Sequence, residues 1–150
     1  MTDRHEPNYR LLLEFRTGLR RFLHWSEECA AAVGLTASQH QLLLAVRGHP
    51  DDRGPTVGEV AGYLLLRHHS TVELVDRAEA AGLVRRTRDA DDHRVVRLAL
   101  TRLGERRLEA LTQTHLEELA RFGPRLRELW ENLDSGGRPT TMGNTLEKRR

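Results

Sequence analysis

Residues 56–101 carry the pattern that most constrains the fold of this chain. A capping box that opens at Thr56 predicts a helix start, and Gly82 is placed to end a second helix that follows a tight turn. Residues 83–88 and 94–100 alternate apolar and basic side chains on either side of a charged tip, which is typical of a β-hairpin. Two helices followed by such a hairpin predict a winged helix-turn-helix.

Periodic apolar residues predict further helices on both sides of this segment. Residues 8–33 repeat apolar side chains at helical spacing, and a second capping box opens a helix at Thr36. A long final helix follows Thr101, and we expect Gly123-Pro124 to interrupt it before a last helical face resumes. Between residues 56 and 82, the expected buried positions are Val57, Val60, Ala61, Leu64, Thr71, Leu74, Val75 and Ala78.

These elements predict a mainly α-helical fold with a small β-hairpin wing (α+β), which suits a chain of 150 residues. We expect one domain over residues 1–134, with residues 36–101 as its DNA-binding module. The flanking segments, 8–33 and 102–134, are expected to be dimerisation helices. The polar residues 135–150 are expected to be disordered.

The second helix of this module begins with polar side chains that suit a DNA major groove. Unpaired backbone N–H groups at a helix start can hold a phosphate. Val72 could contact a thymine methyl group, and Glu73 could accept from cytosine or pair with Arg77 four residues on. The residues expected to meet DNA are Arg67, His68, His69, Ser70, Val72, Glu73 and Arg77.

The hairpin carries arginines that suit the DNA backbone and a neighbouring minor groove. Arginine fits both because its planar fork donates two parallel hydrogen bonds. Asp92 lies two residues before Arg94, close enough to hold that guanidinium in one rotamer, and the held side chain could enter a narrow minor groove. The candidates for neutralising the phosphate backbone are Arg77, Arg85, Arg86, Arg88 and Arg97.

The outer helices carry more apolar residues than a small winged-helix module needs. Such an extra apolar stripe is usually an interface. A two-fold dimer would place two recognition helices about one DNA turn apart and would demand a palindromic site. The residues expected to form the dimer interface are Leu12, Phe15, Leu19, Leu126, Leu129, Trp130 and Leu133.

Aromatic residues between the outer helices and the module suggest a binding site for a small aromatic effector. The candidate lining residues are Phe22, His24, Trp25 and His40. Cys29 is a candidate redox sensor only if its pKa is lowered, and its neighbours Glu27 and Glu28 disfavour a thiolate. A redox-gated regulator is therefore an alternative that requires DNA release through Cys29.

Composition and motifs exclude several classes of protein. The net charge is only +2, so any basic surface must be local. One cysteine excludes an intrachain disulfide, and the adjacent His68 and His69 would point about 100° apart on a helix, too far to chelate one ion. No glycine-rich phosphate loop or Ser-His-Asp order supports an enzyme. We expect no enzymatic activity, no cofactor and no metal.

The start of the chain is charged and lacks a secretory signal, and no stretch approaches the ~20 apolar residues that span a bilayer. We therefore expect a soluble, cytoplasmic protein with no membrane partner. The sequence also leaves open a winged-helix module that binds protein without specific DNA binding, and an enzyme that uses the histidines. Salt dependence of binding separates the first from DNA binding, and a metal assay tests the second.

Three segments resemble the MarR family of bacterial transcriptional regulators, over roughly residues 8–134. They are Gly34-Leu35-Thr36 with Gln39, Leu42 and Leu43; Val57-Gly58-Glu59-Val60-Ala61 with Leu74-Val75-Asp76-Arg77 and Ala81-Gly82-Leu83-Val84-Arg85-Arg86; and Asp91-Asp92-His93-Arg94 with Leu98-Ala99-Leu100-Thr101 and Gly104. The wing combined with the preceding Gly-Leu-Val is the specific part of this likeness.

The resemblance implies a homodimer on a pseudo-palindromic operator, with recognition helices in major grooves and Arg94 in the minor groove. It also implies that a phenolic or other small ligand, bound between the dimer and DNA-binding regions, releases the DNA. The sequence departs from the family at Arg67, at His68-His69 and at Glu73, so the resemblance implies no particular operator sequence. We therefore expect a homodimeric repressor of a palindromic operator, with double-stranded DNA as partner.

Overall fold

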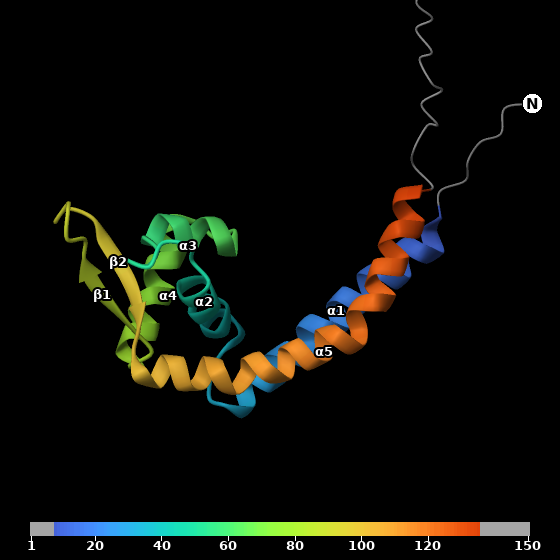
Figure 1. Cartoon of the computed structure of the whole chain (residues 1–150), viewed down its shortest axis with the longest axis horizontal. Coiled ribbons are helices and arrows are strands. Elements are labelled where there is room, and N and C mark those ends of the chain that lie inside the picture. Colours follow the sequence, from blue (N-terminus) through green and yellow to red (C-terminus); the bar gives the residue numbers. More distant parts are fainter. Residues whose placement is uncertain (1–7, 136–150) are drawn as a thin grey trace, which may run out of the picture.

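The computed structural model describes residues 8–135 of the chain. They form α1 (Tyr9–Ala32), α2 (Ala37–Arg47), α3 (Val57–Leu64), α4 (His68–Ala80), β1 (Val84–Arg88), β2 (Val96–Leu100) and α5 (Arg102–Ser135). Figure 1 shows a head, made of α2, α3, α4 and the hairpin, and an arm, in which α1 accompanies the later part of α5. The expected mainly helical winged-helix fold is confirmed.

Both predicted capping boxes are present and set the starts of α2 and α3. The hydroxyl of Thr36 accepts from the backbone N–H of Gln39 at 3.1 Å, and the Gln39 side chain accepts from Thr36 N–H at 3.0 Å. Thr56 and Glu59 repeat this exchange at 3.2 and 2.7 Å. Each box satisfies two backbone donors that a helix start otherwise leaves unpaired.

The core of the head lies between α2, α3, α4 and one face of the hairpin. The predicted inner faces of α3 and α4 are confirmed at their central positions, because Val60, Leu74 and Val75 are all buried. The largest fully buried side chains are Leu42, Leu43, Leu83, Leu98, Val60, Val75, Val84 and Thr71. This core fixes which face of α4 remains at the surface.

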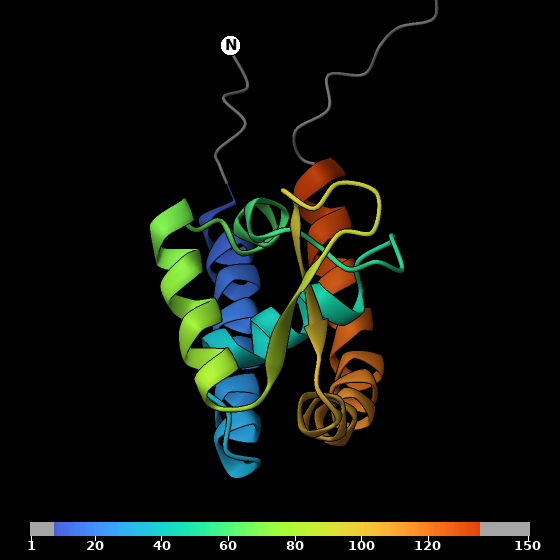
Figure 2. The same ribbon diagram turned by 90° about the vertical axis from the view of Figure 1, so that its left-hand side faces the viewer.

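The hairpin is antiparallel, and its register pairs Val84 with Leu100 and Arg88 with Val96. Figure 2 shows the hairpin next to α4, which precedes it in the chain. Leu98 is fully buried, whereas Val96 is 38% exposed because it lies next to the tip. The alternation predicted for β2 therefore holds at its centre, where the buried Leu98 lies between half-buried neighbours, and not at its outer end.

The expected interruption at Gly123-Pro124 is wrong, because α5 continues through both residues to Ser135. Gly123 has no Cβ to crowd the proline ring, which is the clash that normally disfavours a helical residue before proline. The predicted disordered tail over residues 135–150 lies outside the described residues except for Ser135, at which the helix ends.

Within residues 8–135, no single helix is long and apolar enough to cross a membrane. Only α1 and α2 taken together reach that length and composition, and this pair is bent by 91°.

The turn between α3 and α4 holds Leu65 in the left-handed region, with φ 54° and ψ 39°, and its side chain is 92% exposed. A residue with a Cβ pays roughly 1 kcal/mol in this region. We expect Leu65→Gly to raise the free energy of unfolding by about 0.5–1 kcal/mol in urea denaturation. As a control, Leu44→Gly replaces another exposed leucine inside α2 and should destabilise by about 1 kcal/mol. Destabilisation by Leu65→Gly would contradict this account of the turn.

Candidate nucleic-acid interface

The start of α4 is exposed and carries no side-chain cap. Arg67 occupies the N-cap position, and no side chain accepts from the first turn there. Both His68 and His69 lie at the surface of this turn. Unpaired N–H groups and the positive end of the helix dipole favour an anion at this position.

The buried residues of α4 determine which side chains are presented outward. Thr71, Leu74 and Val75 face the core, and the Thr71 hydroxyl donates to the carbonyl of Arg67 at 3.0 Å. Glu73 and Arg77 are exposed and make no ion pair with each other in the described structure, although they lie four residues apart. Glu73 therefore stays available as an acceptor. Ser70 and Val72 are half-buried at the two edges of the outward face.

A shallow groove of about 400 Å³ joins α4 to the wing. It brings together His68 and Val72 from α4 with Arg94 from the hairpin tip. The remaining residues that line it are Thr56, Val57, Gly58, Arg86, Val95 and Val96. The start of α3, which sequence reasoning did not include in the interface, thus lies on the same surface.

Arg94 projects from the hairpin tip with 91% of its side chain exposed. Its Nε and Nη2 donate to the two oxygens of Asp92 at 3.0 and 3.1 Å, and its backbone N–H donates to the same carboxylate at 3.1 Å. These bonds from Arg94 lower the pKa of Asp92. The paired geometry that the sequence predicts for these two residues is present, while the role of Arg94 in binding stays a prediction.

The remaining acidic residues of the tip are also engaged. Asp89 is buried, and it accepts from Arg97 Nε at 2.5 Å and from the backbone N–H groups of Asp91 and Asp92 at 2.9 and 3.2 Å. The bond from Arg97, reinforced by those two amides, lowers the pKa of Asp89 to about 2. Arg53 contacts both Asp89 and Asp91. A tip that carries three carboxylates is therefore largely compensated in charge.

Two arginines proposed for the phosphate backbone are committed to contacts within the chain. Arg86 bonds Asp76 at 2.6 Å and Glu79 at 2.8 Å, so its charge is already matched by two carboxylates. Arg97 is mostly buried and also donates to the carbonyl of Gly54 at 3.0 Å. Both residues hold the hairpin to the rest of the head, which corrects the expectation that they are free for phosphate.

The remaining arginines proposed for the phosphate backbone are more available, although Arg85 lines the hollow that contains Arg47 and Ala99 rather than the groove between α4 and the wing. Arg67, Arg77 and Arg85 are exposed and have no ion-pair partner within residues 8–135. Arg88 is exposed as well, and its Nη1 donates to the carbonyl of His93 at 3.1 Å. Four guanidinium groups therefore stay accessible to phosphate in addition to Arg94.

The expected effector site is a packed cluster rather than an open cavity. His115 of α5 fills its centre, at ring-centroid distances of 4.7 Å from Trp25, 4.9 Å from His40 and 6.2 Å from Phe22. His24 does not belong to this cluster, because it is exposed and faces Glu28 at 3.5 Å. Assigning His24 to the site is therefore wrong. It lies one residue from Trp25 and so points elsewhere on the helix.

The cluster joins the arm to the head. Because the carbonyl of Leu111 can only accept, the 2.8 Å contact places a hydrogen on His115 Nδ1, and in the neutral ring Nε2 accepts from the Ser26 hydroxyl at 2.7 Å. Burial, and then the electrostatic effect of the neighbouring His115 ring, lower the pKa of His40. The joint thus contains a histidine that favours its neutral form.

Acidification should weaken the fold through His40. Its pKa in the folded chain lies below the ordinary value of 6.5, so the unfolded chain binds the proton more readily. We expect the midpoint of thermal unfolding to fall as the pH drops from 7 through 6.5 to 5, and His40→Leu to flatten this dependence. Asp51, Asp89 and Asp92 contribute only as the pH falls through their ordinary value of 3.8 toward their lowered pKa values. An unchanged pH profile in His40→Leu would assign the effect to another group.

Cys29 is half-buried in α1. Burial raises its pKa, and the charges of Glu28 and Glu118 raise it further. A raised pKa keeps the sulfur as an unreactive thiol, which disfavours the redox-gated alternative. Within residues 8–135, no three His, Cys, Asp or Glu side chains gather in a metal-binding arrangement.

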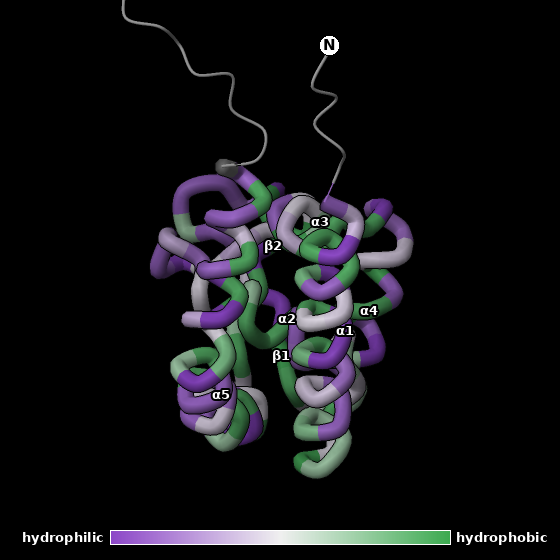
Figure 3. Tube along the Cα trace, turned by 90° about the vertical axis from the view of Figure 1, so that its right-hand side faces the viewer, coloured by the Kyte–Doolittle hydropathy of each residue, from purple (hydrophilic) through white to green (hydrophobic). Residues whose placement is uncertain are grey.

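Several of the expected dimer residues form a seam within the chain. Phe15 packs on Trp130 with a ring-centroid distance of 5.8 Å, and Leu129 is 3% exposed, so Leu129 is already covered by its own chain. Assigning Leu129 to a contact with a second copy therefore needs correction. Leu12, Leu19 and Trp130 remain exposed, and Figure 3 shows apolar segments recurring along α1 and α5.

Comparisons with known proteins agree with this geometry. Residues 33–95 match the sequence model of the MarR family. A curated relative, the uncharacterized HTH-type transcriptional regulator YsmB of Bacillus subtilis (strain 168), is 38% identical over 64 residues. That match spans 43% of this chain and 44% of YsmB, less than half of either protein.

Solved structures are similar over most of the chain. A MarR family protein from Bacillus stearothermophilus is 28% identical, with a TM-score of 0.63 over 86% of this chain and 99% of that one. A mutant MarR from E. coli, complexed with operator DNA, is 21% identical, with a TM-score of 0.63 over 83% and 94% of the two chains. At this identity the second likeness shows the fold.

Proposed function

We propose that this chain is a transcription regulator of the MarR family, whose sequence model residues 33–95 match, and that it binds double-stranded DNA in a sequence-specific manner. The observation that carries the proposal is the shared groove of His68, Val72 and Arg94, which joins the exposed start of α4 to the wing. In this proposal α4 enters a major groove and Arg94 enters the adjacent minor groove. A transcription regulator is not an enzyme, so this proposal is consistent with the expectation of a non-enzymatic protein.

The residues predicted to meet DNA on this surface each have a proposed part. His68, His69 and Ser70 contact base edges, Val72 meets a thymine methyl group, and Glu73 accepts from cytosine N4. The guanidinium groups proposed to neutralise phosphates are those of Arg67, Arg77, Arg85 and Arg88. The operator-bound structure of the E. coli MarR mutant supports this mode of binding through its similar fold.

A homodimer is part of the proposal. Leu12, Leu19 and Trp130 leave apolar surface exposed on the arm, and a second copy of the chain would bury it. A two-fold dimer would place two α4 helices on successive turns of DNA. Sedimentation of the purified protein tests this point, since the proposal requires a dimer at the concentrations that bind DNA.

The proposed regulator acts in the cytoplasm as a repressor that occupies its operator. In this proposal an aromatic effector acts at Phe22, Trp25 and His40, whose packing around His115 connects the arm to the head. An effector would have to separate these packed rings, and that motion would change the placement of the two heads. Isothermal titration with small aromatic acids, with and without DNA, tests this part of the proposal.

Salt dependence distinguishes DNA binding from docking of a protein on the same surface. Arg contacts to phosphates release counterions, so the affinity for a duplex should fall by orders of magnitude between roughly 50 and 200 mM salt. We expect a steep linear fall of log affinity with log salt for the wild-type protein. If the protein does not bind a duplex even at low salt, the alternative of a winged-helix module that binds protein is favoured.

A further inference from the structure

The loop between α2 and α3 lies along β2 of the hairpin. Leu98 N–H donates to the carbonyl of Pro55 at 2.8 Å, and Thr56 forms an isolated antiparallel bridge with Arg97. Gly54 approaches β2 so closely that a Cβ there would lie 2.1 Å from the Leu98 carbonyl oxygen. The loop therefore acts as an extra edge beside β2, and its side chains can reach the tip.

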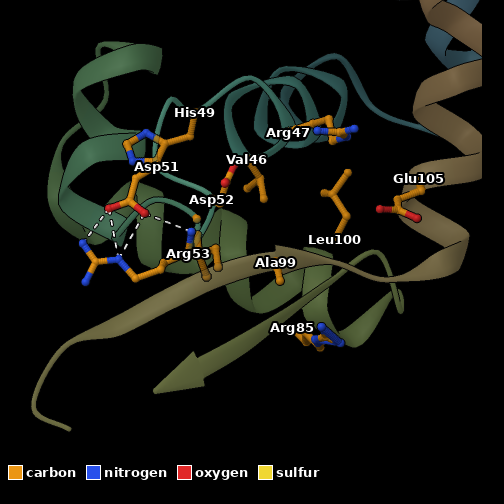
Figure 4. A pocket seen from close by; sticks show the side chains of 12 residues that line it. Val46, Arg47, His49, Asp51, Asp52, Arg53, Arg85, Ala99, Leu100 and Glu105 are labelled. Carbon is orange, nitrogen blue, oxygen red and sulfur yellow. Dashed lines mark hydrogen bonds and ion pairs between the residues drawn. The ribbon is translucent and has the colours of Figure 1, made fainter. Parts of the chain in front are cut away.

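Arg53 of this loop contacts three carboxylates. Its Nη2 and Nε bond Asp51 at 2.7 and 3.1 Å, and its Nη1 reaches Asp89 at 3.3 Å and Asp91 at 3.4 Å. Figure 4 shows the paired Arg53 and Asp51 beside β2. The bond from Arg53 holds the pKa of Asp51 well below its usual range. One guanidinium thus connects the loop to the wing across a separation of 36–38 residues in the chain.

The contacts continue from Asp89 to Arg94. Asp89 accepts from the backbone N–H groups of Asp91 and Asp92, which gives the tip its turn. Asp92 in turn holds the guanidinium of Arg94 through both of its oxygens. Arg94 is therefore connected through Asp92 to Asp89, on which two guanidinium groups converge, that of Arg97 at 2.5 Å and that of Arg53 at 3.3 Å.

We propose that Arg53 is a positioning residue for the wing, which aims Arg94 by holding Asp89 and Asp91 against the loop. Arg53 also offsets the charge of Asp91, which would otherwise repel phosphate at the tip. This inference rests on the proposed binding of DNA, because it assigns Arg53 an action through Arg94 rather than a contact of its own.

A double-mutant cycle tests this assignment. Arg53→Gln removes the charge, and we expect roughly tenfold weaker binding, in fluorescence anisotropy, to the duplex that the wild-type protein selects. If Arg53 acts through Arg94, then Arg53→Gln should cost little more in the background of Arg94→Ala. Fold losses that multiply in the double variant would overturn the proposal and indicate a direct phosphate contact by Arg53.

Arg47 provides the matched control. It lines the same hollow as Arg53, as Figure 4 shows, but it is exposed and has no bonded partner within residues 8–135. Arg47→Gln should change neither the affinity nor its coupling to Arg94. If Arg53→Gln and Arg47→Gln lose equal affinity for the duplex, the effect of Arg53 is only that of one positive charge, and the proposal is overturned.

Amide exchange in the free protein separates this inference from the proposed function. Arg53→Gln should speed hydrogen exchange at the Asp91 and Asp92 amides several-fold and leave the midpoint of thermal unfolding within about 2 °C, because half-exposed ion pairs contribute little to stability. Unchanged exchange at both amides would overturn the proposal even if the protein binds DNA. If Arg53→Gln speeds exchange at these amides but the protein selects no duplex, the contact of Arg53 with the hairpin tip is established and the proposed function is wrong.

Discussion

Arg94→Ala should weaken binding to the selected duplex by roughly 5- to 150-fold, measured by gel shift at constant salt. The side chain is almost fully exposed at the tip and is held by Asp92 in one direction. Because Asp92 already holds the guanidinium in one rotamer, Arg94 loses little conformational entropy when it enters a narrow minor groove, where the negative potential is enhanced. The effect is expected to be among the largest of any single arginine on this surface.

Arg94→Lys separates shape from charge. Lysine keeps the positive charge but cannot donate a planar pair of hydrogen bonds, so we expect the salt slope to be retained and part of the affinity to be lost. Unchanged affinity in Arg94→Ala would remove this residue from the interface. The reading of DNA would then rest on α4 alone.

Gly104→Ala should destabilise the fold by roughly 3–5 kcal/mol. A Cβ at this position in α5 would lie 2.1 Å from the carbonyl oxygen of Leu83 and 3.1 Å from its carbonyl carbon. Neither atom can rotate away, since both belong to the backbone. The start of α5 would have to shift from the hairpin, which we expect to lower the midpoint of thermal unfolding by roughly 10 °C.

Gly62→Ala is the matched control for this prediction. Gly62 lies inside α3, and a Cβ there would meet no atom within 4 Å. The same substitution should therefore stabilise the fold by about 1 kcal/mol through helix propensity alone. If both variants lost stability equally, the close approach of Gly104 to Leu83 would not be the cause.

Local chemistry explains why much of the head could be predicted. Thr36 and Thr56 each begin a capping box within four consecutive residues, and the apolar spacing of α4 points Leu74 and Val75 inward before any partner is known. The wing pair of Asp92 and Arg94 is local in the same sense, because its members lie two positions apart. Such features depend on short-range geometry.

The features that could not be predicted depend on contacts between distant segments. Arg53, in the loop between α2 and α3, meets Asp89 of the hairpin at a separation of 36 residues, and His115 meets Ser26 at a separation of 89 residues. Only the tertiary fold shows that Arg86 is held by α4, whereas Arg85, one position earlier, makes no ion pair within the described residues. The continuity of α5 through Pro124 likewise depends on the glycine before it and on packing along α1.

Selection of bound duplexes from a random DNA pool tests most directly the claim that two equivalent α4 helices read one site. We predict enrichment of a two-fold-symmetric sequence whose half-sites lie about 10–10.5 base pairs apart, or a multiple of that spacing. Among the selected duplexes, the base pairs between those contacted by α4 and those contacted by the wing should have sequences that favour a narrow minor groove. A pool that shows no enrichment, or that yields a single half-site without a symmetric counterpart, would contradict the account.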